Sequence, residues 1–154
     1  MTLDAGDKAP DFTLPTDGNG EFSLSRLKGK PVVLYFYPKD DTSGCTKEAM
    51  GFRDALGAFE KAGVAVVGVS KDSVAKHDKF KSKYDLNFPL VSDEDGALCE
   101  AYGVWVEKSM YGRKYMGIER STFLIDAEGK IAKTWRKVKI PGHVDEVLAA
   151  VQAL

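Results

Sequence analysis

The sequence reads YPKDDTSGCTKE from Tyr37 to Glu48. Before this stretch, the segment Val32–Tyr37 is apolar on both faces, which predicts a central strand covered on both sides. After it, a helix that buries one face is predicted by apolar residues spaced three and four apart, at Ala49, Phe52, Leu56 and Phe59. Cys45 extends that apolar face by one step of four, so its side chain is expected to point toward the sheet.

The position of Cys45 at the start of a helix suggests thiol chemistry. Partial positive charge gathers at a helix N-terminus from N–H groups without intrahelical partners, and this charge favours the thiolate form of a cysteine. The alternative is that Cys45 is a small core residue, as most lone cysteines are. The residues around Cys45 decide between the two readings.

Composition sets the class of protein. The 154 residues suit one domain, 1–154, and a content of 44% hydrophobic residues can form a core. A net charge of −1 gives no electrostatic case for binding nucleic acid or an anionic membrane. No apolar run is long enough to span a bilayer, and the first residues lack a signal-peptide pattern. We therefore expect a cytoplasmic protein.

Strands and helices are predicted to alternate along the chain. Asp17–Gly20 is a turn signal for an N-terminal β-hairpin. Later elements are expected as a strand at 64–70, a helix at 73–84, a strand at 88–91, a helix at 93–102 with Ser92 or Asp93 as its N-cap, a long polar excursion at 104–119, a hairpin of 121–126 with 130–135, and a helix at 141–154. This order predicts an α/β fold in which helices flank a central mixed β-sheet, an arrangement that is thioredoxin-like.

The spacing Pro38-x-x-x-Thr42-x-x-Cys45 resembles the active-site signature of peroxiredoxins. The wider run from Phe36 to Glu48 is similar to the bacterioferritin comigratory protein (BCP, PrxQ) subfamily. The resemblance continues in the segments 7–12, 101–105, 109–112 and 117–126, and so covers nearly the whole chain. It implies a thioredoxin-fold oxidoreductase with antioxidant peroxidase activity. Members of this subfamily are often monomers, so the resemblance also leads us to expect a monomer.

The resemblance implies a role for each residue of the site. Cys45 would be the peroxidatic cysteine, whose thiolate attacks a hydroperoxide and becomes a sulfenic acid. Thr42 and Arg120 would hold sulfur and peroxide oxygens, and Pro38 would limit access by water. Glu48 would hold Arg120 through a charge-assisted hydrogen bond. No cofactor or metal is implied, and the chain has no Cys-x-x-Cys pair and only two histidines.

The chain departs from the resemblance at the resolving cysteine. Many PrxQ proteins carry a second cysteine five residues after the first, where this chain has Met50. Another arrangement places it on the following helix, here Ser73–Tyr84, which contains none. Cys99 is therefore the one candidate resolving cysteine, and its alternative is a small buried helix residue. We expect a one-cysteine mechanism in which thioredoxin, glutaredoxin or a small thiol reduces Cys45.

Each residue also has a simpler interpretation. Thr42 could act only as a helix N-cap, Glu48 could be a solvated acid in the first turn, and Arg120 could be a surface residue. Trp105 and Tyr111 are expected to pack rather than to contact substrate. Two other functions compete with the peroxidase: a disulfide reductase, which would need Cys-x-x-Cys and a cis-proline before Ser121, and a non-catalytic binding module. The sequence lacks both features of the reductase.

Overall fold

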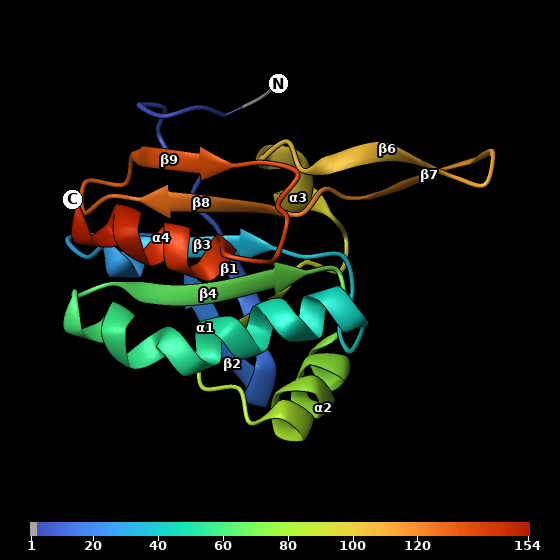
Figure 1. Cartoon of the computed structure of the whole chain (residues 1–154), viewed down its shortest axis with the longest axis horizontal. Helices are drawn as coiled ribbons and strands as arrows, with labels where there is room; N and C mark the ends of the chain where they lie inside the picture. Colours follow the sequence, from blue (N-terminus) through green and yellow to red (C-terminus); the bar gives the residue numbers. More distant parts are fainter. Residues whose placement is uncertain (1–2) are drawn as a thin grey trace.

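The computed structural model describes residues 3–154. Their main sheet is mixed, has seven strands and is covered by helices on both faces (Figure 1). The strands lie in the order β2-β1-β5-β4-β3-β8-β9. Their bounds are β1 Thr13–Thr16, β2 Gly20–Ser23, β3 Val32–Phe36, β4 Ala65–Ser70, β5 Leu90–Ser92, β8 Ser121–Ile125 and β9 Ile131–Trp135. This confirms the predicted α/β fold with a mixed sheet and an N-terminal hairpin.

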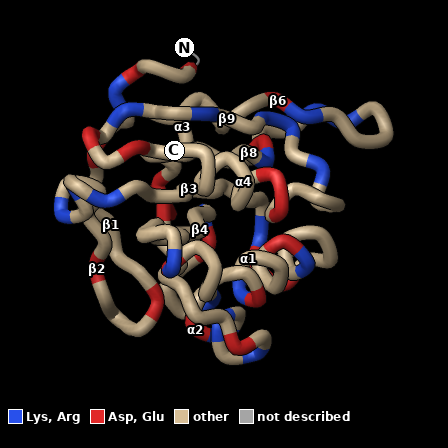
Figure 2. The backbone as a smooth tube through the Cα atoms, turned by 60° about the vertical axis from the view of Figure 1, so that its left-hand side comes forward, with Lys and Arg blue, Asp and Glu red and all other residues tan. Residues whose placement is uncertain are grey.

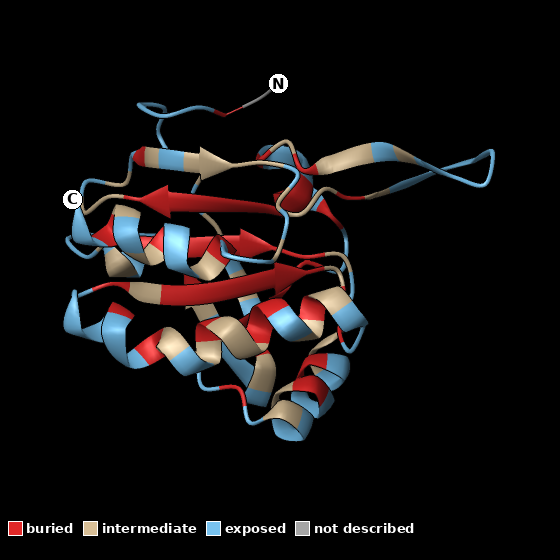
Figure 3. Cartoon of the chain, viewed as in Figure 1, coloured by how far each residue is buried: buried red, intermediate tan, exposed pale blue. Residues whose placement is uncertain are grey.

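Strand β3 occupies the middle of the sheet because it is apolar on both faces. It pairs in parallel with β4 and antiparallel with β8, and all five of its residues are buried (Figure 3). Val33 and Tyr35 point into the core on one face, and Leu34 and Phe36 point into the core on the other. The side chains of consecutive residues thus divide the interior into two separate clusters.

The helices are divided unequally between the two faces. Phe52 of α1 (Ser43–Lys61), Phe80 of α2 (Val74–Tyr84) and Val147 of α4 (His143–Gln152) belong to the core cluster that contains Tyr35. Leu98 of the short helix α3 (Ala97–Ala101) belongs to the cluster that contains Leu34. Helices α1, α2 and α4 therefore share one face of the sheet, and α3 covers the other.

Residues 104–119 differ from the expected excursion. They contain a two-stranded hairpin, β6 (Trp105–Met110) with β7 (Arg113–Ile118), that projects away from the body of the molecule (Figure 1). Tyr111 and Gly112 connect the strands with positive φ angles of 52° and 77°, as a tight hairpin turn requires. Both faces of much of the hairpin are exposed, so its residues are polar and lack the alternation that would predict strands.

Two local expectations were also wrong. Tyr111 does not pack: it stands 99% exposed at the hairpin turn, whereas Trp105 packs against the core as expected. The third helix begins at Ala97 rather than near Asp93. The Asp93 carboxylate nevertheless accepts hydrogen bonds from the N–H groups of Leu98 and Cys99, so it caps this helix from a distance.

Candidate active site

Cys45 is the third residue of α1, and its side chain faces the sheet. The thiol is 1% exposed and belongs to the core cluster that includes Tyr35 and Ala49. The first N–H to donate backward in this helix is that of Thr46, to the carbonyl of Thr42 at 2.8 Å. The N–H groups of Gly44 and Cys45 are therefore among those that the helix leaves without a partner.

Arg120 reaches Cys45 because of the register between β3 and β8. Phe36 is paired with Ser121, so Arg120 lies where β3 ends and the loop to α1 begins. Its Nη2 donates a hydrogen bond to Cys45 Sγ at 3.2 Å. The backbone of Arg120 is held in turn by the N–H of Val138, which donates to its carbonyl at 3.0 Å. The structure thus brings together two of the residues that the sequence placed in the site.

Glu48 lies one turn after Cys45 on the same buried face of α1. Its Oε1 accepts a hydrogen bond of 2.7 Å from Nη1 of Arg120, which confirms the predicted contact. The side chain is 1% exposed, so the alternative of a solvated acid is wrong. Burial raises the pKa of Glu48 to about 7, although the charge and hydrogen bond of Arg120 act to lower it.

Arg120 stays cationic between these two partners. Burial disfavours its charge, but Glu48 and Cys45 outweigh that effect, so the net pKa of Arg120 is raised. The second oxygen of Glu48, Oε2, is buried without a hydrogen-bond partner, as is the hydroxyl of Tyr35. Cys45, Arg120 and Glu48 therefore meet in a largely dehydrated space, where electrostatic interactions are strong.

Thr42 takes the N-cap position of α1 with an extended backbone, but its side chain does not cap the helix. Its hydroxyl donates instead to the carbonyl of Lys39 at 2.8 Å, and the residue is exposed. The oxygen lone pairs of Thr42 remain able to accept a hydrogen bond from a ligand. Pro38 is half-buried and connects β3 to this turn.

Cys99 lies on the other face of the sheet. It is fully buried in the cluster that contains Leu34 and Tyr102, whereas Cys45 belongs to the cluster that contains Tyr35. Burial raises the pKa of the Cys99 thiol well above its usual value, and the hydrogen bond and charge of Asp93 raise it further. The structure therefore does not bring Cys99 to the site, and the simpler reading of a small buried residue fits it.

The comparisons with known proteins agree with this geometry. The AhpC/TSA family model matches residues 5–134. The Bcp peroxiredoxin of Bacillus subtilis is 51% identical over 152 residues, which are 99% of this chain and 97% of that protein. The chain therefore belongs to the AhpC/TSA family of peroxiredoxins. It is a thiol-dependent peroxidase of the BCP/PrxQ type.

Other relatives support the same membership. A Coxiella burnetii protein that carries the bcp peroxiredoxin name is 61% identical over 148 residues, 96% of this chain and 98% of that protein. The Xanthomonas campestris bacterioferritin comigratory protein, whose structures concern alkyl peroxide reduction, superposes with a TM-score of 0.91 at 49% identity and covers 97% of this chain and 98% of that one. This peroxiredoxin has their thioredoxin-like fold.

The disulfide-reductase alternative does not fit the site of this peroxiredoxin. Glu48 occupies the place where Cys-x-x-Cys would put its second cysteine. None of the peptide bonds in residues 3–154 is cis, so the chain before Ser121 lacks the cis-proline of that alternative. Within the same residues, no group of three or more His, Cys, Asp or Glu side chains could hold a metal ion.

Two residues near the site, Ile140 and Lys108, were not predicted from the sequence. A Cβ atom on Gly44 would lie 3.0 Å from Cδ1 of Ile140 and 3.4 Å from Nη2 of Arg120, so the glycine allows both side chains to approach. Lys108 of β6 lies near enough to Arg120 and Cys45 for their charges to act on its pKa, which burial lowers first. The glycine is visible in the sequence, but Ile140 and Lys108 carry no local signal.

Proposed function

We propose that Cys45 is the peroxidatic cysteine. Its thiolate attacks one oxygen of a hydroperoxide, a sulfur–oxygen bond forms and the oxygen–oxygen bond breaks. Cys45 is oxidised to sulfenic acid, and the leaving oxygen takes up a proton and departs as water or an alcohol. The observation that carries this proposal is the 3.2 Å hydrogen bond from the Arg120 guanidinium to Sγ, at the start of a helix.

The surrounding residues would orient the peroxide and stabilise the leaving oxygen. Arg120 has further N–H groups that can reach a peroxide oxygen beside the sulfur. The hydroxyl oxygen of Thr42 can accept a hydrogen bond from the O–H of the peroxide. Free N–H groups at the start of α1 can donate hydrogen bonds to the peroxide oxygens. Glu48 fixes the guanidinium, and Pro38 shapes the turn. Positioning of this kind matters because a reactive thiolate gains most of its rate from alignment with the peroxide.

We further propose that an external thiol restores Cys45. Met50 stands where many relatives of this subfamily have a resolving cysteine, and Cys99 packs on the opposite face of the sheet. The sulfenic acid would therefore condense with thioredoxin, glutaredoxin or a small thiol, and a second thiol equivalent would release reduced Cys45. Cycling of this kind needs a reducing compartment, which supports a cytoplasmic location.

The substrates we propose are hydrogen peroxide and organic hydroperoxides. The apolar tip of Ile140 lies against the space over Gly44, beside Arg120, and could contact the alkyl part of an organic hydroperoxide. Macromolecular substrates are not proposed, because the 22 basic and 23 acidic residues nearly balance, and Figure 2 shows both kinds spread along the backbone. No helix within residues 3–154 has the length and hydrophobicity to cross a bilayer. We propose a monomer as the working form.

The test is peroxide consumption with each reductant. Wild-type protein should consume hydrogen peroxide and cumene hydroperoxide when thioredoxin or a glutathione–glutaredoxin couple is supplied. Cys45→Ser should abolish this consumption, and Cys99→Ala should preserve it. Unchanged consumption by Cys45→Ser would contradict the proposal and would favour the non-catalytic binding module.

A further inference from the structure

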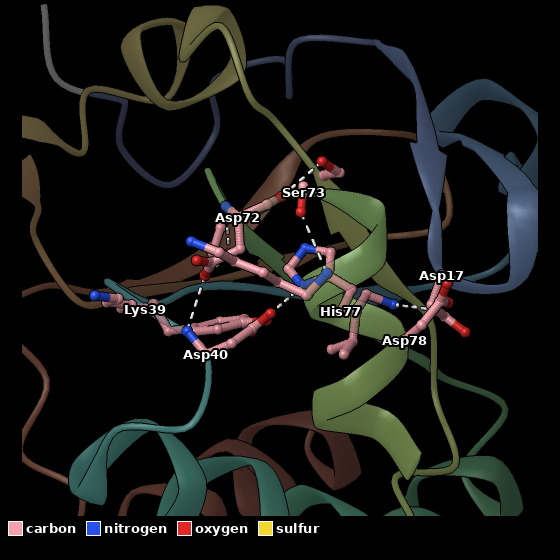
Figure 4. A network of polar contacts seen from close by, with 12 residues as sticks. Asp17, Lys39, Asp40, Asp72, Ser73, His77 and Asp78 are labelled. Atoms are coloured by element: carbon pink, nitrogen blue, oxygen red, sulfur yellow. Dashed lines mark hydrogen bonds and ion pairs between the residues drawn. The ribbon is translucent and has the colours of Figure 1, made fainter. Parts of the chain in front are cut away.

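A buried polar network lies beside the active-site loop and joins it to α2 (Figure 4). His77 of α2 is fully buried, and its Nδ1 lies 2.6 Å from Oδ2 of Asp40. Its Nε2 lies 2.9 Å from the carbonyl oxygen of Val91. The other oxygen of Asp40 accepts a hydrogen bond of 2.6 Å from the hydroxyl of Tyr37. Asp40 thus has two partners for its carboxylate in the core.

The partners of His77 define its protonation. A carbonyl oxygen can only accept, so Nε2 carries a proton and donates to Val91. Nδ1 faces a carboxylate that already accepts from Tyr37, so it too is best placed as a donor. Burial acts to lower the pKa of His77, but the hydrogen bond and charge of Asp40, with smaller effects of Val91 and Asp72, raise it overall. Both ring nitrogens thus face acceptors, an arrangement that favours the imidazolium form of His77 bound to Asp40.

The backbone of Asp40 is held from a second side. Its N–H donates to Oδ2 of Asp72 at 2.8 Å, and that same oxygen accepts from the hydroxyl of Ser70 at 2.7 Å. Asp72 follows β4, so the loop after β3 is joined to the end of the neighbouring strand. Asp40 is thereby fixed through both its side chain and its main chain.

The next residue of the loop is held by the end of α2. Asp41 has a positive φ of 58°, which is unusual for a residue other than glycine. Its carboxylate accepts hydrogen bonds from the hydroxyl of Tyr84 and from Nζ of Lys83. Helix α2 therefore binds the loop at Asp40 through His77 and at Asp41 through its last turn, immediately before Thr42.

Helix α2 can serve as an anchor because other contacts hold it in place. Lys81 forms an ion pair of 2.8 Å with Asp17, and Asp17 also accepts a hydrogen bond from the N–H of Leu90. Asp78 accepts from the N–H of Gly18 at 2.7 Å. The helix is thus attached to the turn between β1 and β2, away from the active-site loop.

We propose that His77 is a positioning residue of the peroxidase reaction, which binds Asp40 and so holds Thr42 and the first turn of α1 in line with the peroxide. This rests on the proposed role of Cys45 and Thr42. His77 does not touch the reacting atoms. Its effect is on alignment, so it should influence the reaction with peroxide much more than the reactivity of the Cys45 thiol toward a small alkylating reagent.

The test compares two reactions of Cys45 under single-turnover conditions: oxidation by hydrogen peroxide and alkylation by iodoacetamide. Alkylation needs the thiolate but does not need the hydrogen bonds by which Thr42 and the start of α1 would orient the peroxide. His77→Gln, which keeps a donor for Val91 but loses the imidazolium, should lower the oxidation rate by on the order of tenfold to a hundredfold and leave alkylation near the wild-type rate. His77→Asn, whose amide replaces the Nδ1 donor to Asp40, should recover part of the oxidation rate.

Ser73→Ala is the matched control on the same helix. The hydroxyl of Ser73 caps α2 by accepting from the N–H of Lys76, and it has no contact with Asp40. This variant should lower the melting temperature but keep the wild-type ratio of oxidation to alkylation. A similar fall of that ratio in Ser73→Ala and His77→Gln would overturn the proposal, as would an unchanged ratio in His77→Gln or equal losses in the Asn and Gln variants.

A second measurement follows the same two reactions as the pH is varied. The groups that face His77 are Tyr37 and Asp40 from the loop side, Asp72 from the end of β4 and the Val91 carbonyl from β5. Because the pKa of His77 is raised, the contact between protonated His77 and Asp40 is complete at lower pH. This contact is lost as the pH rises through that pKa. The ratio of oxidation to alkylation should fall over this range in the wild type, and the fall should be smaller in His77→Gln, where titration of other groups such as Glu48 remains. An equal fall in the two proteins would overturn the proposal. A flat wild-type ratio would overturn the proposal, whereas loss of the proposed function itself would appear as oxidation that survives Cys45→Ser.

Discussion

Nη2 of Arg120 donates a hydrogen bond of 3.2 Å to Sγ of Cys45, although the two residues are 75 positions apart in the sequence. The antiparallel register of β8 on β3 brings them together, since it places Arg120 at the end of the sheet where α1 starts. A second nitrogen of the same guanidinium binds Glu48. One planar group thus connects the thiol to a buried carboxylate.

We expect Arg120→Lys to lower the second-order rate constant for peroxide by roughly a hundredfold to a thousandfold. An ammonium group keeps the charge but cannot place two N–H donors in the fixed geometry that reaches Sγ and Glu48 together. Stopped-flow measurement of Cys45 oxidation tests this. Arg26→Lys is the matched control, because Arg26 is exposed and pairs with Glu21 at the surface. A wild-type rate for Arg120→Lys would contradict the role of the guanidinium.

Glu48 should make the stability of the protein depend on pH. The pKa of Glu48 is raised from 4.5 to about 7, mainly by burial, so between these values the native state keeps a proton that the unfolded state releases. Unfolding is then favoured as pH rises, and the contribution is on the order of 3 kcal/mol across the window. Urea unfolding of wild type and Glu48→Gln at pH 5 and pH 8 measures it. The variant should gain stability relative to the wild type at the higher pH, and a difference that is independent of pH would refute the prediction.

His143 should produce the opposite slope at lower pH. Its Nε2 lies 2.8 Å from the hydroxyl of the buried Thr122, and burial lowers its pKa from 6.5 to about 4, with Arg120 as a smaller cause in the same direction. Between pH 6.5 and pH 4, His143 is therefore protonated in the unfolded state but neutral in the native state. The free energy of unfolding falls by up to about 3 kcal/mol as the pH decreases over this range. The free energy of unfolding of His143→Gln should lack this dependence. Parallel acid unfolding curves for the two proteins would rule the effect out.

Cys99→Ala should leave peroxide turnover unchanged while it weakens the fold. Cys99 is fully buried against α3 and β3 residues, so loss of its sulfur removes packing contacts and should cost about 1 kcal/mol. Thermal unfolding and a thioredoxin-coupled peroxidase assay measure the two effects separately. Lost turnover in a folded Cys99→Ala protein would show that Cys99 takes part in the cycle.

The sequence predicted those parts of the site that depend on local pattern. The apolar segment Val32–Tyr37 and the helical spacing from Ala49 to Phe59 correctly predict β3 and α1, and therefore the buried direction of Cys45. The contact between Glu48 and Arg120 was predicted through the resemblance, which pairs residues that no local pattern connects.

Other features depend on tertiary packing and could not be predicted in this way. Asp40 and His77 are 37 positions apart, and a carboxylate in a turn gives no sign that it will be buried against a histidine. The face on which Cys99 lies follows from the side of the sheet that α3 covers, which the helical pattern alone leaves undetermined. The β6–β7 hairpin was missed because its exposed strands lack the alternation produced by burial on one face.

Mass spectrometry tests the one-cysteine mechanism most directly. Reduced wild-type protein is treated with one equivalent of hydrogen peroxide in the absence of external thiol, with dimedone present to trap sulfenic acid. We expect monomeric protein that carries a single dimedone adduct on the peptide of Cys45, with Cys99 still a free thiol. Monomer that has lost two hydrogens and contains a disulfide between Cys45 and Cys99 would contradict the one-cysteine mechanism.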